Sequence, residues 1–482
     1  MSNTPRTEMP DGLVAVVKRD CPTCVSVAPV LSALAADGEL TVYSQDDPAF
    51  PESVNVVDDT DLAFSWAHDI ETVPTLIRVE NGAEVARTVG WLRPEWESLT
   101  GASGLGEGLA ELLPGCGSRS VDPDMVTTLA VRYGGETMRS RRVELATLED
   151  EFEAMYARGW SDGLPLVPPT AERVMRMLEG TSRAPDEVIA VAPPELEPVT
   201  VEKVAVNAVM AGCLPEYLPV VITAIEAACT DEFNMHGLLC TLWFSGPILI
   251  VNGPIAERIG MNSGHNALGQ GNRANSTIGR AFQLVIRNVG GGRPGSDGID
   301  RSALGSPGKL GFAFAEAEQA SAWDSLASER GFAAGADTVT LFAGHGPIPV
   351  MDQVSRTPES LARSLAGGFR ALQHHKLAGV DAMLVISPEH QRVFSDAGWS
   401  KQRFRDELDH LLAIPGAEMV KGAGSIEEGM DAKYTDRTLH KLRKGMPLIV
   451  FAGGGAGAFS AILGGWVGGR IGSNPVTAEI IP

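Results

Sequence analysis

The sequence predicts an α/β fold, in which buried strands alternate with helices along its 482 residues. Apolar runs of strand length recur, for example at Leu13–Val17, Thr338–Phe342 and Met446–Phe451. Segments with helical periodicity follow several of these runs, as in folds built from strand–helix units. Glycine-rich turns stand between strand and helix. We therefore expect a small N-terminal domain and a larger α/β region of one or two subdomains.

Composition narrows the classes of protein to which the chain can belong. Hydrophobic residues make up 44% and charged residues 21%, as in ordinary globular proteins. The net charge of −22 argues against nucleic acid or an anionic membrane as a partner. No apolar run reaches the length of a membrane span, and the N-terminus lacks the apolar core of a signal peptide. Six cysteines in so long a chain are no disulfide framework, so we expect a cytoplasmic protein.

A Cys-x-x-Cys motif, Cys21 to Cys24, stands between the apolar run Leu13–Val17 and a predicted helix over 25–36. The first thiol then lies at a helix N-terminus, where unpaired backbone N–H groups and the helix dipole favour the thiolate. Two cysteines at this spacing can also close a disulfide without moving the backbone. The stretch predicts a redox-active dithiol, and no further cofactor is indicated.

This segment resembles the thioredoxin family over roughly residues 10–100, about a fifth of the chain. The resemblance implies a thioredoxin-like domain in which Cys21 is the attacking thiol, Cys24 is the resolving thiol, and Pro74 lines the substrate groove. The features that match are the Cys-x-x-Cys motif, Pro29 in the helix after it, the segment Val73-Pro74-Thr75 at the start of a strand, and the hairpin signal Asn81-Gly82.

Two positions depart from that family. Asp20 stands where a Trp is usual, and Ala15 replaces a buried acid. The acid helps to move a proton to or from the resolving thiol, so its loss implies slower exchange or exchange tuned to one partner. Two alternatives stay open, a degenerate domain kept for docking and half of a zinc site. No second Cys-x-x-Cys pair is present in the sequence to complete the zinc site.

A glycine-rich segment over 101–120 follows, and its composition predicts a linker between domains at 1–100 and 121–482. Cys116 stands between two glycines there, so its backbone is open to a ligand or a partner thiol. Arg119 can lower the pKa of this cysteine by its charge. Cys116-Gly117-Ser118 resembles a bacterial family named for a selenocysteine-Gly-Ser-Cys motif, with Arg119 at the last position. A glycine turn with an incidental cysteine is the alternative.

The densest polar stretch of the larger region, 262–309, predicts a ligand-binding loop, with a structural glycine-rich loop as the alternative. Arg273 and Arg280 lie two turns apart on a predicted helix, where they can grip a carboxylate or phosphate. His345 follows a strand in a glycine turn, a common catalytic placement. A Gly-x-Gly turn near the end can bind an anion. The predicted substrate-binding residues are His265, Asn272, Arg273, Arg280, Arg293, Lys309, Gly453 and Gly455.

Other residues carry weaker predictions. Trp160 and Asp162 lie in a turn-rich stretch that can wall a pocket or act as a structural strap. Cys213, Cys229 and Cys240 lie in apolar segments and should be shielded. His236 and Cys240 are spaced so that they could seat a metal on a helix, but no third ligand is in register, so we expect no metal site.

Thiol–disulfide exchange through a mixed disulfide is the chemistry that the sequence specifies best. We expect a thiol-dependent oxidoreductase whose dithiol passes electrons to the larger region, where Cys116 and the polar loops act on a small, anionic substrate. A second hypothesis is a lyase or hydrolase that cleaves a carbon–heteroatom bond, with the dithiol keeping Cys116 reduced. A redox docking adaptor is the third. The expected partners are the small-molecule substrate and an external thiol reductant, and a homo-oligomer is compatible with the sequence.

Overall fold

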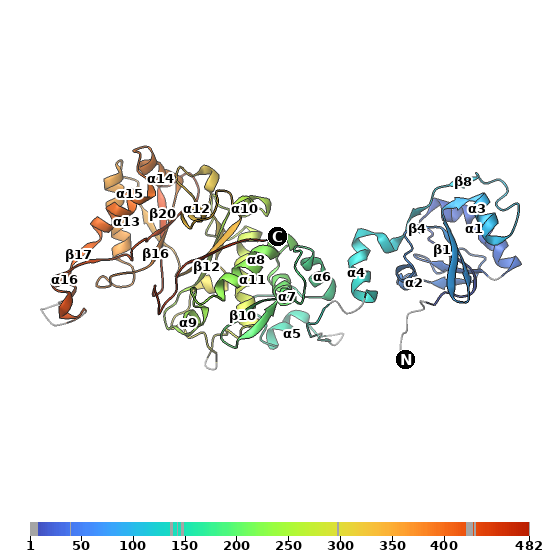
Figure 1. Ribbon diagram of the computed structural model, residues 1–482, viewed down its shortest axis with the longest axis horizontal. Helices are drawn as coiled ribbons and strands as arrows, with labels where there is room; N and C mark the ends of the chain where they lie inside the picture. The colour runs from blue at the N-terminus through green and yellow to red at the C-terminus, as the bar shows by residue number, and fades with distance from the viewer. Residues whose placement is uncertain are drawn as a thin grey trace. The chain divides into compact units, whose positions relative to one another are not determined.

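Figure 1 shows the computed structural model of the chain, which describes residues 8–481 apart from 39, 135–137, 142, 146–148, 296, 297, 421–427 and 429. The chain forms two compact units, Met1–Thr137 and Met138–Pro482. Both units combine helices with β-sheets, so the predicted α/β fold is confirmed. The first unit extends well beyond the boundary expected at residue 100.

The first unit is built on a five-stranded sheet in the order β3-β2-β1-β5-β6. β1 is its central strand, parallel to β2 and antiparallel to β5, and its last four residues are fully buried. This burial accounts for the uninterrupted apolar run in its sequence. The strands are β1 (Gly12–Val17), β2 (Leu40–Ser44), β3 (Val56–Asp58), β5 (Thr75–Glu80) and β6 (Ala83–Val89), and the helices are α1 (Pro22–Asp37), α2 (Ala63–Ala67), α3 (Arg93–Thr100) and α4 (Pro123–Tyr133).

The segment 101–120, predicted to be a linker, is folded onto the first unit. The short strand β8 (Leu112–Leu113) pairs with β7 (Trp91–Leu92), and β9 (Cys116–Gly117) pairs with β4 (Thr72–Val73). Trp91 is fully buried, and its indole donates a hydrogen bond of 2.8 Å to the carbonyl of Ala110. The linker prediction is therefore wrong, because the glycines here permit close packing instead of free movement.

The larger unit contains two four-stranded sheets, in the orders β13-β12-β14-β21 and β15-β20-β16-β19. Ile248, Ile250 and Phe342 of the first sheet share a buried cluster with Met383 and Val385 of the second, so the two sheets pack face to face. The strands are β12 (Gly246–Asn252), β13 (Ala313–Ala315), β14 (Thr338–Gly344), β15 (Ile348–Met351), β16 (Ala382–Ile386), β19 (Leu448–Phe451), β20 (Phe459–Gly464) and β21 (Val476–Glu479).

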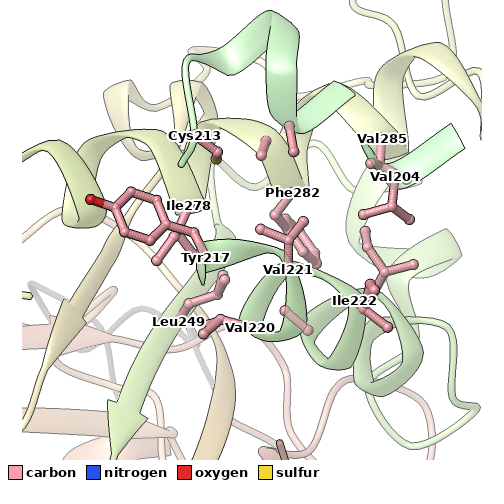
Figure 2. Packing of buried hydrophobic residues seen from close by; sticks show 14 of the residues in the cluster. Val204, Cys213, Tyr217, Val220, Val221, Ile222, Leu249, Ile278, Phe282 and Val285 are labelled. Atoms are coloured by element: carbon pink, nitrogen blue, oxygen red, sulfur yellow. The ribbon is translucent and has the colours of Figure 1, made fainter. Parts of the chain in front are cut away.

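Helices cover the outer face of each sheet, where the side chains that point away from the other sheet are buried. The helices of this unit are α5 (Glu151–Ala157), α6 (Ala171–Leu178), α7 (Val201–Ala211), α8 (Leu218–Ala228), α9 (Met235–Cys240), α10 (Pro254–Arg258), α11 (Arg273–Asn288), α12 (Leu326–Glu329), α13 (Pro358–Arg370), α14 (Pro388–Ser395), α15 (Lys401–Leu411) and α16 (Gly416–Val420). Figure 2 shows Leu249 of β12 near Val221 of α8 and Phe282 of α11. On the second sheet, Leu384 and Ile386 pack with α13, α14 and α15. The unit therefore has four layers, helices outside and sheets inside.

Two short strand pairs complete the larger unit. β10 (Val188–Ala192) pairs with β11 (Glu197–Thr200), and β17 (Ala413–Pro415) pairs with β18 (Thr438–His440), both antiparallel. Among the helices that the structure describes, none is long and apolar enough to cross a membrane.

Candidate active site

The Cys-x-x-Cys motif lies between β1 and α1. Cys21 immediately precedes the helix, and its sulfur accepts the backbone N–H of Cys24 at 3.4 Å. Pro22 occupies the first turn, where the N–H that proline lacks has no partner within the helix. Cys21 is only 1% exposed, and Cys24 is fully buried. The dithiol thus sits at a helix start, as the local pattern predicted.

A third thiol lies against this dithiol. The sulfur of Cys116 is 2.9 Å from that of Cys21, although 95 residues separate them in the chain. A disulfide bond measures about 2.05 Å, so this is a close approach between two free thiols. The sulfur of Cys21 also lies 3.6 Å from the carbonyl oxygen of Val73. A small movement of Cys116 is therefore enough to bring its sulfur within bonding distance of Cys21.

The pairing of β9 with β4 carries Cys116 to this position. Val73 stands opposite Cys116, and Thr72 stands opposite Gly117, in an antiparallel register. The peptide bond from Val73 to Pro74 is cis. Pro74 is buried, and its carbonyl oxygen accepts a hydrogen bond of 2.7 Å from the backbone N–H of Gly90. Cys116 therefore lies beside the segment for which the sequence suggested a substrate groove.

Two side chains near the dithiol hold the segment around Cys116. The hydroxyl of Thr23 donates to the carbonyl of Pro114 at 2.6 Å. The ammonium of Lys18 donates to the carbonyl of Gly117 at 2.8 Å. Each contact joins residues more than 90 positions apart. No local sequence signal pointed to Thr23 or Lys18 as parts of the site.

The neighbours of Cys116 in the chain are also tightly placed. A Cβ atom added to Gly115 would clash with the side chain of Thr72. Ser118 is fully buried, and its hydroxyl accepts a hydrogen bond of 2.6 Å from the amide of Gln45. Cys116 is thus fixed by packing on one side and by a buried hydrogen bond on the other.

The three thiols differ in acidity. Burial raises the pKa of Cys21, but hydrogen bonds from the Cys116 thiol and from the Cys24 backbone outweigh it, so this pKa falls below its ordinary value. Burial raises the pKa of Cys24 far above its ordinary value. The pKa of Cys116 is raised as well, first by burial and then by the hydrogen bond to Cys21. Of the three, Cys21 is the thiol that ionises most readily.

The cation beside Cys116 differs from the one expected. Arg119 donates through Nη1 to the backbone carbonyl of Gln45 at 3.0 Å. The positive charge that acts to lower the pKa of Cys116 belongs to Lys18, although burial and Cys21 outweigh it. The expectation for Arg119 is therefore corrected, because its guanidinium is held by Gln45.

The two arginines predicted to grip an anion on α11 are engaged separately. Arg280 donates two hydrogen bonds of 2.8 Å to the carboxylate of Asp162. Their side chains are 15% and 9% exposed. Arg273 donates through Nε to the carbonyl of Gly212 at 2.9 Å. The predicted pair of anion ligands is thus corrected, because Asp162 already neutralises the guanidinium of Arg280. Asp162 itself acts as part of a structural strap.

Two further predicted ligands have structural partners. Lys309 forms an ion pair of 2.6 Å with Asp300. Asn272 caps α11 by accepting the backbone N–H of Asn275 at 3.0 Å. Both side chains stabilise their own loops, which corrects their assignment to substrate binding and favours the structural alternative for much of 262–309.

His265 and the predicted Gly-x-Gly turn do come together. The ring of His265 lies so close to Gly454 that a Cβ atom there would overlap it. The N–H of Gly453 donates to the carbonyl of Ser263 at 2.9 Å. Gly455 has open space around its Cα. The two loops therefore pack on each other, and the missing side chain of Gly454 permits this close approach.

His345 directly follows β14 and is 9% exposed. Its Nδ1 lies 2.8 Å from the carbonyl of Gly346, and its ring packs over Gly464 so closely that a Cβ atom there would overlap it. These are the surroundings of a buried histidine that packs two loops together.

A cavity of about 780 Å³ lies among α5, α6, α7 and the end of α11. Its wall is apolar at Met155, Trp160 and Val174. Arg293, which the sequence predicted to bind a ligand, also lines this cavity. The volume is in the range of small-molecule sites. The sequence singled out Trp160 and Arg293 separately but not the cavity, because its helices meet only in the folded unit.

Two buried polar atoms, one in the wall of this cavity and one in a residue near it, have no hydrogen-bond partner among the described residues. Asn288 lines it, and its Oδ1 is buried without a hydrogen-bond partner among the described residues. The Nδ2 of Asn288 donates to Oδ1 of Asn207 at 2.9 Å. Burial and then the charge of nearby Arg293 lower the pKa of Arg287, whose Nε is likewise without a partner in the described part of the chain. Two cations therefore stand close together beside the cavity.

The remaining cysteines lie apart from the dithiol in the chain. Cys213 is buried, and burial raises its pKa to about 12. Burial also raises the pKa of Cys229 to about 12. Cys240 is exposed, which corrects the expectation that all three are shielded, because it ends α9 at the surface. Within the described residues, no group of three His, Cys, Asp or Glu side chains is placed to hold a metal ion.

Comparison of the chain with models of known protein families, with curated proteins and with solved structures finds no match. Its function is therefore inferred from the three thiols and from the cavity.

Proposed function

We propose that the first unit is a thiol–disulfide oxidoreductase whose dithiol exchanges a disulfide with Cys116 of the same chain. The observation that carries this proposal is the distance of 2.9 Å between the sulfurs of Cys21 and Cys116. The order of the sheet, the dithiol at the start of α1 and the cis bond before Pro74 support the thioredoxin-like assignment made from the sequence.

The exchange takes two electrons from the dithiol. When Cys116 has attacked a substrate disulfide and carries one half of it as a mixed disulfide, the Cys21 thiolate attacks the Cys116 sulfur and expels that half as a thiolate. A Cys21–Cys116 disulfide results. Cys24 then gives its proton to the expelled thiolate and attacks Cys21, which releases Cys116 as a thiolate and leaves a Cys21–Cys24 disulfide. An external thiol reductant restores the dithiol.

The acidity of each thiol suits its step. Cys21 has the lowered pKa, so it is the thiolate that attacks and also the better leaving group when a thiol reopens its disulfide. Cys24 has the raised pKa and stays protonated until the Cys21–Cys116 bond has formed. Its burial keeps it from reacting with anything except Cys21.

Counting free thiols after mild oxidation with diamide tests this function. We use a Cys240→Ser background, because Cys240 is exposed and can link two chains. In that background the unmodified site, the Cys24→Ser variant and the Cys116→Ser variant should each form one disulfide per chain, because Cys21 keeps a partner in all three. The double variant with both substitutions should form none. An equal loss of thiols in the double variant would show that other cysteines react and would refute the proposal.

For the larger unit we propose that the cavity binds a small anion with an apolar body. Met155, Trp160 and Val174 supply an apolar wall. Arg293 lines the cavity, and its charge helps to lower the pKa of the nearby Arg287, so an anion placed between the two guanidinium groups would relieve their repulsion. The cavity wall also carries Glu195, Glu197 and Glu202, so the anionic group is expected at the Arg293 end. This site replaces the anion site expected at Arg273 and Arg280.

Binding of the dye anilinonaphthalene sulfonate, an aromatic anion, tests the cavity. The full chain should bind it with increased fluorescence, and Val206→Phe, which adds bulk at the cavity wall, should weaken binding at least about tenfold. Val191→Phe adds the same bulk at an exposed strand position and should have no effect. Equal dye binding by the two variants would contradict the assignment.

A further inference from the structure

We infer that the cysteine site acts on small disulfides and excludes protein disulfides, an inference that rests on the function proposed above. A protein client commonly docks by adding a strand to a free backbone edge. Beside Cys21 that edge is β4, and β9 already pairs with it, with Cys116 opposite Val73. A client chain has to displace β9 before it can pair there.

The segment that occupies this edge is anchored along its length. Before Cys116, β8 pairs with β7, and Thr23 donates to the carbonyl of Pro114 at 2.6 Å. After it, Lys18 holds the carbonyl of Gly117, and the N–H of Ser118 donates to the carbonyl of Glu71 at 2.9 Å. The hydroxyl of Ser118 is buried in its own network. Displacing the segment breaks these bonds together, so a weakly bound client does not displace it.

Access to the sulfurs points the same way. Cys21 is 1% exposed, and Cys24 is fully buried, so neither sulfur can be reached by a disulfide in a folded protein. Cys116 is partly exposed, and the neighbouring Gly117 is exposed. A small molecule can approach the sulfur of Cys116 past a residue that has no side chain. Cys116 is therefore the thiol that meets the substrate first.

A small disulfide is reduced here with balanced atoms and electrons. Cys116 passes its proton to the Cys21 thiolate 2.9 Å away and attacks one sulfur of the substrate. The S–S bond of the substrate breaks, and the released thiolate takes the proton back from Cys21. The two exchange steps described above then release the second half of the substrate. In total the substrate gains two electrons and leaves as two thiols, and a Cys21–Cys24 disulfide remains.

Single-turnover reduction of two substrates tests this inference. The reduced full chain should reduce glutathione disulfide and should reduce insulin much more slowly. Gly115→Val should expel the segment, because its added side chain clashes with Thr72. It should therefore raise the rate with insulin by about tenfold or more and lower the rate with glutathione disulfide. Ala83→Val is the matched control, since it adds a similar side chain at an exposed position of β6 that takes no part in the cysteine site, and both rates should stay unchanged.

The outcomes separate this inference from the proposed function. If the wild type reduces both substrates at similar rates, the function stands and the exclusion of protein disulfides is wrong. If the wild type reduces neither substrate and the Cys24→Ser variant forms no Cys21–Cys116 bond, the proposed function fails. Should Gly115→Val not fold, Thr23→Val removes the bond to Pro114 without a clash and should raise insulin reduction a few-fold. An unchanged rate in a folded Thr23→Val variant would then count against the inference.

Discussion

Replacing Arg280 with Ala is expected to destabilise the larger unit by about 3–5 kcal/mol, because it leaves a mostly buried carboxylate without its partner. Arg280 holds Asp162 through two hydrogen bonds of 2.8 Å and also donates to the carbonyls of Leu164 and Pro165. Burial raises the pKa of Asp162, but the charge and hydrogen bonds of Arg280 outweigh it, so the pKa is lowered. This group stabilises the fold above its unfolded pKa, and the contribution is lost as the pH falls through its folded pKa.

Urea denaturation measures this effect, with the unfolding of the larger unit followed as its own transition. Arg273→Ala is the matched control, because Arg273 lies on the same helix and makes one bond, to the carbonyl of Gly212. It should cost about 1 kcal/mol or less. Arg280→Lys keeps the positive charge but loses the planar guanidinium group, so its loss of unfolding free energy should lie between those of Arg273→Ala and Arg280→Ala. If Arg280→Ala costs no more than Arg273→Ala, Arg280 is not a structural clamp.

The elements of the fold that the sequence predicted are those with a strong local pattern. The apolar runs at 13–17 and 338–342 lie in β1 and β14, and the run at 446–451 contains β19; most residues of these strands are buried on both faces. The four layers of the larger unit were not predicted. They depend on which face of β12 meets which partner, and Ile248 and Leu249 look alike in the sequence while facing opposite layers.

The candidate site likewise has one part that the sequence predicted and one part that it did not. Cys21 and Cys24 could be placed from a motif of four residues followed by a helical pattern. The contact of Cys116 with Cys21 spans 95 residues and arises from the pairing of β9 with β4. Each of these strands is only two residues long, which is too short for a sequence pattern to predict it. Glycines at 101–117 indicated a linker, since composition alone does not separate a free chain from one that packs closely.

Charged residues were the least predictable part. Arg280 meets Asp162 across 118 residues, so the partner that turns a candidate ligand into a structural clamp lies outside any local window. Lys309 and Asp300 are only nine residues apart, but a loop connects them, and no periodicity places them face to face. Long-range pairs of this kind decide whether a basic residue is free for a ligand.

The most direct measurement of the central claim is the identity of the disulfide that forms in a Cys24→Ser variant. Without the resolving thiol, the bond between Cys21 and Cys116 has no path to Cys21–Cys24, so it should accumulate nearly completely under mild oxidation. Its formation should slow as the pH falls through the lowered pKa of Cys21, because the attacking thiolate is lost.

Peptide mapping of the non-reduced protein identifies the bond. We expect a linked pair of peptides that contain Cys21 and Cys116 of one chain, absent after reduction and absent in the Cys24→Ser, Cys116→Ser double variant. Cys21 found only with glutathione, or only linked to a second chain, would contradict the exchange between Cys21 and Cys116 on which the proposed function depends.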